Sequence, residues 1–158
     1  MLECGRGSRP GTEGLQGSAM VQIDPAFLTT SHALASLPLC EARLQDDARF
    51  PWIVLIPRVA DAVEIEDLTA DQRTALLEEI VLAGAAVRAI GAALGRPAAK
   101  LNVGQLGNIT RQLHLHVVGR RQDDRCWPGP VWGQGVVEAY GAEELGAATR
   151  AAVSAFSE

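Results

Sequence analysis

Two of the three histidines in this chain lie on a short segment with alternating polarity, residues 111–118, which reads Arg-Gln-Leu-His-Leu-His-Val-Val. Successive side chains of a β-strand point to opposite faces of its sheet. The alternation therefore predicts a strand with Gln112, His114 and His116 on one face and apolar residues on the other. Imidazole is suited to acid–base and nucleophilic chemistry near neutral pH, so this face is the candidate functional site.

The spacing of these histidines admits three interpretations. In the first, both side chains face solvent and have no chemical role. In the second, they bind a metal ion, but a zinc site needs further ligands. Only His32 and Cys126 offer more nitrogen or sulfur, and neither has metal-site spacing, so we expect no metal site. In the third, one imidazole attacks a substrate while the other handles a proton or a charge.

The segment and its surroundings are similar to a known family. Gln112–Val118 resembles the motif of the histidine triad (HIT) family, in which three histidines alternate with apolar residues. The resemblance covers about residues 37–133 and includes Leu55-Ile56-Pro57-Arg58, Asn102, Gly119-Arg120-Arg121 and Trp127-Pro128-Gly129. It is closest to a bacterial, diadenosine polyphosphate hydrolase-like subgroup whose motif begins with Gln.

The resemblance implies a covalent mechanism. His114 would attack the α-phosphorus of a dinucleoside polyphosphate or a nucleoside phosphoramidate and form a nucleotidyl-histidine. His116 would contact the phosphate and assist the leaving group, and Gln112 could orient a neighbour, because a carboxamide donates and accepts hydrogen bonds. This chemistry requires no cofactor, although Mg²⁺ can accompany a polyphosphate substrate. Family members are commonly homodimers, so we expect one here.

Two departures from the family pattern leave an alternative open. Gln112 stands where the family has a histidine, and Ile109 stands where relatives often place a hydroxyl. A carboxamide cannot carry a proton as imidazolium does. The alternative is therefore a nucleotide-binding module of the same fold with weak catalysis.

The resemblance also implies substrate-binding residues, each with a purely structural alternative. Backbone N–H groups at Gly107 and Asn108 would contact phosphate oxygens, unless these residues only form a turn. Asp46 or Asp47 would bind the ribose hydroxyls, unless both are solvated turn residues. The remaining candidates are Asn102, which matches a recurrent family asparagine, and Trp127, which with Trp132 would close one edge of the cleft or serve as a packing anchor.

The composition of the chain bears on its number of domains, its partners and its cellular compartment. The chain has 158 residues, which suits one domain, and its net charge of -5 argues against nucleic acid as a partner. Its three cysteines include no CxxC pair, which favours a reducing cytoplasm, and no apolar run is long enough to cross a membrane. We expect residues 1–19 to be a disordered extension and residues 20–158 a single domain, with Met20 as a candidate start.

The helices and strands that must position the histidines are predicted from the spacing of apolar residues and from helix-capping and turn residues. Asp24-Pro25 predicts the start of a short helix that runs to about His32, and Thr69 with Gln72 predicts a capped helix that ends at Gly95. Glu78 and Glu79 are expected on its solvated face. Strands are predicted at 37–44, 52–56, 100–103 and 111–118, and a last helix at 142–156. Two hairpins with a long helix between them, followed by a C-terminal helix, predict an α+β fold with an antiparallel sheet.

Overall fold

The computed structural model describes residues 21–157 and confirms the α+β architecture. A five-stranded antiparallel sheet has the order β1-β2-β3-β5-β4. Its strands are β1 (Ser31–Ser36), β2 (Cys40–Gln45), β3 (Trp52–Pro57), β4 (Lys100–Gly104) and β5 (Leu115–Arg120). The helices are α1 (Pro25–Thr30), α2 (Ala70–Ala93) and α3 (Ala142–Ala155), with a 3-10 turn, η1, at Ile65–Asp67. The predicted extension over residues 1–19 lies outside the described residues.

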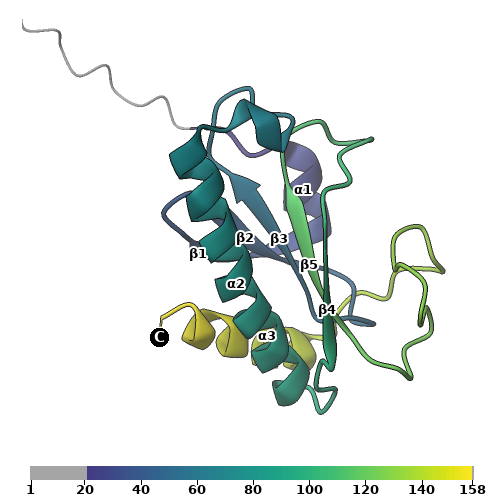
Figure 1. Cartoon of the computed structure of the whole chain (residues 1–158). Helices are drawn as coiled ribbons and strands as arrows, with labels where there is room; N and C mark the ends of the chain where they lie inside the picture. The colour runs from purple at the N-terminus through teal and green to yellow at the C-terminus, as the bar shows by residue number, and fades with distance from the viewer. Residues whose placement is uncertain (1–20, 158) are drawn as a thin grey trace, which may run out of the picture.

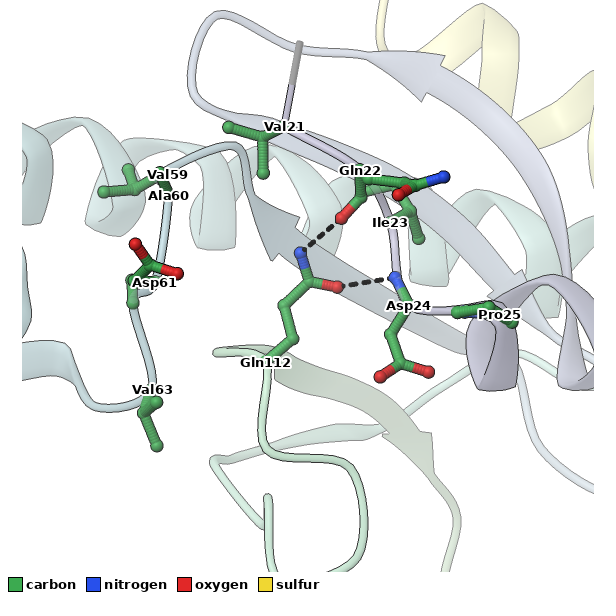
Figure 2. Close-up of a pocket in the computed structure, with 11 residues that line it drawn as sticks. Val21, Gln22, Ile23, Asp24, Pro25, Val59, Ala60, Asp61, Val63 and Gln112 are labelled. Atoms are coloured by element: carbon green, nitrogen blue, oxygen red, sulfur yellow. Dashed lines mark hydrogen bonds between the residues drawn. The ribbon is translucent and has the colours of Figure 1, made fainter. Parts of the chain in front are cut away.

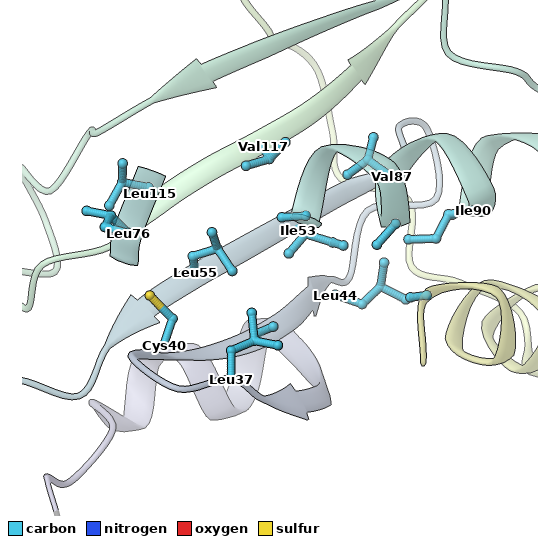
Figure 3. Packing of buried hydrophobic residues seen from close by; sticks show 14 of the residues in the cluster. Leu37, Cys40, Leu44, Ile53, Leu55, Leu76, Val87, Ile90, Leu115 and Val117 are labelled. Atoms are coloured by element: carbon cyan, nitrogen blue, oxygen red, sulfur yellow. The ribbon is translucent and has the colours of Figure 1, made fainter. Parts of the chain in front are cut away.

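The two faces of the sheet are covered by different helices. Figure 1 shows the long helix α2 across one face, with α3 packed against it, and α1 on the opposite side of the sheet. Ile53, Leu55 and Val117 point toward α2 and form the main core, part of which is drawn in Figure 3. The alternate positions, among them Val54 and Val118, point toward α1 and form a second cluster with Phe27. His116 has the same parity as Val118, so it lies on the α1 face.

Helix α2 begins and ends where the sequence predicts. The Thr69 hydroxyl accepts a hydrogen bond from the Gln72 backbone N–H, and the Gln72 side chain accepts one from the Thr69 N–H. Gly95 follows the helix with a φ of +67°, a left-handed conformation that glycine adopts without strain. None of the described helices is long and apolar enough to cross a membrane.

The expectation that Glu79 lies on a solvated face is wrong. Its side chain is only 3% exposed, and its two carboxylate oxygens accept hydrogen bonds from the backbone N–H groups of Leu39 (2.6 Å) and Cys40 (2.9 Å). Glu79 therefore fastens α2 to the turn between β1 and β2. Burial, together with this carboxylate, raises the pKa of the Cys40 thiol well above its ordinary value.

The first part of the sheet differs from the prediction in its boundaries. The predicted helix end at His32 is wrong, because α1 ends at Thr30 and β1 follows directly. The strand predicted at 37–44 begins only at Cys40, because Leu37–Leu39 form a turn closed by a hydrogen bond from the Leu37 N–H to the Cys40 carbonyl. Strand β1 was not predicted, since its Ser- and Ala-rich sequence is weakly β-forming.

The histidine strand begins later than its alternation suggests. β5 starts at Leu115 rather than at Arg111, because its pairing with β3 reaches no further than Leu55 opposite Leu115. Just before the strand, the Leu113 N–H donates instead to the carbonyl of Ala62, in the loop after β3. Gln112 and His114 therefore precede the regular strand, which gives their backbone a different set of partners.

Candidate functional site

The backbone fixes the tautomer of the neutral His114 ring. Its Nδ1 lies 2.7 Å from the carbonyl oxygen of Gln112, and a carbonyl can only accept a hydrogen bond. The neutral ring therefore carries its proton on Nδ1 and has a lone pair on Nε2. No hydrogen bond within residues 21–157 engages that nitrogen. His114 thus has the form that a nitrogen nucleophile requires.

His116 carries its proton on the opposite nitrogen. The indole N–H of Trp52 donates to Nδ1 of His116 over 3.0 Å, so this nitrogen must be unprotonated and Nε2 must carry the hydrogen. Burial, with a further contribution from His114, lowers the pKa of His116 to about 3. At neutral pH this ring is therefore an uncharged hydrogen-bond donor beside His114, with 5.0 Å between the two ring centroids.

Aromatic side chains enclose both imidazoles. The ring of Phe27, from α1, meets His114 edge to face at 4.8 Å, and Trp52 and Trp132 meet His116 at 5.4 Å and 5.7 Å between centroids. As a result, His114 is only 4% exposed and His116 only 8%. Strong enclosure lowers the local dielectric, which strengthens the hydrogen bonds inside the site.

Among the described residues, no hydrogen bond joins the Gln112 side chain to either imidazole. Its Oε1 accepts a hydrogen bond from the Asp24 N–H (2.8 Å), and its Nε2 donates to the Gln22 carbonyl (3.1 Å), as Figure 2 shows. The carboxamide therefore clasps residues 22–24, the segment that leads into α1 and Phe27. What Gln112 supplies to His114 is its backbone carbonyl, which a residue of any type would also offer.

The predicted phosphate loop lies beside the His114 ring. A Cβ added to Gly107 would lie 3.6 Å from Cε1 of His114 and 3.2 Å from the Thr110 carbonyl oxygen, so glycine lets the backbone approach the imidazole closely. Asn108, the next residue, is exposed, and so is Ile109. This geometry brings Gly107 to the histidines, with Asn108 next to it at the surface.

Asn102 shares the sheet face of His116, because it stands opposite Val118 on the neighbouring strand. Its side-chain oxygen accepts a hydrogen bond from Arg120 over 2.7 Å. Arg120 is only 1% exposed and forms a bidentate pair with Asp124, at 2.8 Å and 2.9 Å. Asn102 is thus tied to a buried ionic network that anchors the segment after β5.

Both candidate ribose-binding aspartates have partners within the protein. Asp47 is buried and pairs with Arg49 over 2.6 Å. Asp46 accepts a hydrogen bond from the Tyr140 N–H and lies 3.4 Å from Nε2 of His32. No hydrogen bond or ion pair in the described part of the chain joins either carboxylate to His114 or His116. Their assignment to ribose stays a prediction.

Of the two candidate tryptophans, Trp132 rather than Trp127 lies at the histidines. Trp127 is partly exposed, and its contact is with the Arg120 guanidinium, 5.8 Å above the indole ring. Trp132 packs against Trp52 and His116, and its indole N–H is buried with no partner among the residues described.

A pocket of about 570 Å³ opens beside Gln112. The clasped N-terminal segment forms one side of it and the loop after β3, residues 59–63, forms the other (Figure 2). Asp24 and Asp61 are among its lining residues, and the described lining includes no Lys or Arg. The pocket therefore has an acidic character and adjoins the residue whose carbonyl holds His114.

Sequence reasoning missed Phe27 and Trp52 as parts of the site. Every residue of β3 is buried, so its sequence shows no alternation that would assign Trp52 to a face. The short helix α1 gave no sign of which element it packs against. Within residues 21–157, no three His, Cys, Asp or Glu side chains gather in a group that could hold a metal ion.

Comparisons with known proteins identify a family and several solved structures to which the chain is similar. The HIT domain family model matches residues 28–123. A histidine triad protein from Sinorhizobium meliloti shares 38% sequence identity and a TM-score of 0.77, over 85% of this chain and 96% of that one. Histidine triad proteins from Bradyrhizobium japonicum (33% identity, TM-score 0.78, 87% and 99% covered) and Marinobacter aquaeolei (32%, 0.77, 88% and 98%) are also similar. No curated protein matches the chain. By the extent of the family match and the identity to these structures, the chain belongs to the HIT domain family.

Proposed function

We propose that this protein is a cytoplasmic nucleotide hydrolase or nucleotidyl transferase that acts through a nucleotidyl-histidine formed on His114. The observation that carries the proposal is the hydrogen bond from Nδ1 of His114 to the Gln112 carbonyl, which leaves the Nε2 lone pair free. A glutamine at the first motif position is compatible with this role, because His114 is oriented by the backbone carbonyl of residue 112 and not by its side chain. We also propose that the chain belongs to the bacterial, diadenosine polyphosphate hydrolase-like subgroup whose motif begins with Gln.

The reaction has two displacement steps at the α-phosphorus. In the first, the Nε2 lone pair of His114 forms a bond to phosphorus while the bond to the leaving oxygen or nitrogen breaks; the leaving group keeps that electron pair and takes a proton from water. The positive charge on the imidazole ring strengthens its Nδ1–H bond to the Gln112 carbonyl. In the second, water attacks phosphorus, the electron pair of the P–N bond returns to Nε2, and a proton leaves to solvent with release of the nucleoside monophosphate.

His116 and the loop at Gly107 would bind the phosphoryl oxygens during both steps. The Nε2–H of His116 is a neutral donor, and the backbone at Gly107 approaches the His114 ring closely. Donors placed in advance around a phosphoryl group stabilise the charge that builds up on it in the transition state. Asn108, beside Gly107, would extend this set of donors.

Charge favours nucleoside phosphoramidates over dinucleoside polyphosphates as the substrate. The pocket beside Gln112 would accept the leaving group, and its described lining contains Asp24 and Asp61 but no cationic side chain. A polyphosphate chain would bring further negative charge to this lining, whereas an amine leaving group would be neutral or positive. We therefore expect a higher kcat/KM for adenosine phosphoramidates of primary amines.

A homodimer would cover an exposed apolar strip at one side of the molecule. Among the described strands, β4 forms one edge of the sheet, and its Val103 is exposed. Leu77 and Val81 are also exposed and share a face of α2 with Gly84, which approaches Leu101 of β4. Because unpaired edges and apolar strips favour association, we propose that two copies meet along β4 and α2.

The second candidate function is a nucleotide-binding module with weak catalysis. The burial of His114 beneath Phe27 favours it, because in-line attack needs access to the ring nitrogen. Titration calorimetry with nucleoside monophosphates, beside turnover assays, separates the two candidates. Binding without turnover of any nucleotide tested would replace the first proposal by the second.

A substrate panel tests the first proposal. Adenosine phosphoramidates and dinucleoside polyphosphates are assayed with the wild-type protein, His114→Ala and His32→Ala. We expect turnover in the wild type and in His32→Ala, since His32 lies on β1, which β2 and β3 separate from the histidine strand β5. Turnover should be lost in His114→Ala. Equal turnover in His114→Ala and the wild type would exclude His114 as the nucleophile.

A further inference from the structure

The two imidazoles of the site are held as opposite tautomers by two different groups. A backbone carbonyl fixes the proton of His114 on Nδ1, whereas an indole N–H fixes the proton of His116 on Nε2. The first group is available from any residue type. The second depends on the side chain at position 52, which the motif itself does not include.

Trp52 is built into the sheet in a way that defines this contact. It is the first residue of β3 and stands opposite Val118, while Val54 stands opposite His116. Trp52 and His116 are therefore diagonal neighbours on one sheet face, within reach of a large aromatic ring. Both are buried, and the two rings meet nearly at right angles, at 73°. A buried N–H and a buried ring nitrogen each need a partner, and here each satisfies the other.

We propose that Trp52 is a positioning residue of the reaction: its indole N–H holds His116 as the neutral Nε2–H tautomer, so that His116 presents a fixed donor to the phosphoryl oxygens. The inference rests on the proposed function for the identity of the ligand, but the tautomer itself is a property of the free protein. An indole cannot accept a hydrogen bond at Nε1, so the opposite tautomer would set two N–H groups against each other. Without this restraint, rotation or tautomer exchange would present a lone pair to the phosphate in part of the molecules.

Trp132 provides a matched control. It packs on His116 at nearly the same centroid distance, 5.7 Å against 5.4 Å for Trp52. Its indole N–H is buried but has no acceptor in the part of the chain that the structure describes. Trp132→Phe therefore removes aromatic surface and an N–H from the same ring environment without removing a hydrogen bond to His116.

The test is the tautomer of His116 in full-length protein labelled with ¹⁵N in its histidines, without substrate, at neutral pH. Two-bond ¹⁵N–¹H correlation spectra distinguish a protonated ring nitrogen from an unprotonated one, and a His116→Gln sample assigns the signals. We expect protonated Nε2 and unprotonated Nδ1 for His116, and a proton on Nδ1 for His114. The wild-type spectrum alone overturns the inference if His116 carries its proton on Nδ1 or on both nitrogens.

The variants supply the second part of the test. Trp52→Phe should give a mixture of His116 tautomers and lower kcat by roughly fivefold, the effect of one net hydrogen bond. Trp132→Phe should keep the wild-type tautomer. An unchanged tautomer in Trp52→Phe, or an equal change in both variants, contradicts the inference. If the spectra agree with it but no nucleotide is turned over, the proposed function fails while the restraint on the tautomer stands.

Discussion

The two hydrogen bonds of the Gln112 side chain predict how strongly the segment before α1 is held in place. In Gln112→Ala, the hydrogen bonds to the Asp24 N–H and the Gln22 carbonyl are both lost. One net hydrogen bond contributes about 0.5–1.5 kcal/mol, so the segment before α1 loses about 1–3 kcal/mol of the free energy that holds it in place. The affected segment is short and precedes the first strand of the sheet, so it can open without unfolding the domain.

Amide hydrogen exchange measures this local opening. Exchange of the backbone N–H groups between residues 24 and 31 should accelerate by about 5-fold to 150-fold in Gln112→Ala, the range that corresponds to about 1–3 kcal/mol. The amides of β3 and β5 should keep their protection. Phe27 lies in this segment and packs on His114, so the same variant should also raise KM for a nucleotide.

Gln105→Ala is the matched control for the clasp. Gln105 also uses its carboxamide for two hydrogen bonds, to the Val63 carbonyl and the Glu64 carboxylate, on the loop after β3. Its loss should leave exchange at residues 24–31 unchanged. Wild-type exchange at residues 24–31 in Gln112→Ala, or equal acceleration of the same amides in Gln105→Ala, would contradict the proposed role of the Gln112 side chain.

Three further predictions concern stability, pH and association. Glu79→Ala should lower the free energy of unfolding by about 2–4 kcal/mol, because two backbone N–H groups lose their buried acceptor. The neighbouring Glu78 is exposed, so Glu78→Ala should lower it by less than about 0.5 kcal/mol. Equal effects of the two substitutions in urea denaturation would contradict this prediction. The low pKa of His116, about 3 against 6.5 when unfolded, means that the unfolded chain takes up the extra proton between these values. The neutral His116 ring therefore contributes fully to the free energy of unfolding above pH 6.5. This contribution falls by up to about 1.4 kcal/mol per pH unit as the pH drops from 6.5 toward 3. His116→Gln should lack this part of the pH dependence in urea denaturation. Light scattering should find a dimer in the wild type and in Val136→Asp but a monomer in Val81→Asp and Val103→Asp; a monomeric wild type would exclude the proposed interface.

The sequence predicted those elements that carry their own local signals. The capping box at Thr69, the four- and three-residue spacing of apolar positions and Gly95 determine α2 through interactions within the helix itself. Strand β1 lacks such a signal, since its residues form strands only weakly and it is an edge of the sheet. Its place is set by pairing with β2, a contact between segments that local periodicity does not report.

The candidate site was predictable along one strand and not across the fold. Alternation placed His114 and His116 on the same side because that relation depends only on neighbouring residues. The roles of Phe27 and Trp52 depend on which strand lies beside which, and on α1 packing against the face opposite α2. Gln112 shows the same limit: its residue type indicated hydrogen bonding, but its partners, Gln22 and Asp24, lie far away in sequence.

In the proposed mechanism, Nε2 of His114 forms a covalent bond to the nucleotide's α-phosphorus. The most direct test of this bond is rapid acid-free quenching during turnover of an adenosine phosphoramidate, followed by peptide mass spectrometry. The mechanism predicts a transient adenylyl mass on the peptide that carries His114, present in His32→Ala and absent in His114→Ala. Turnover without any such adduct on that peptide, or an adduct on His116 instead, would contradict it.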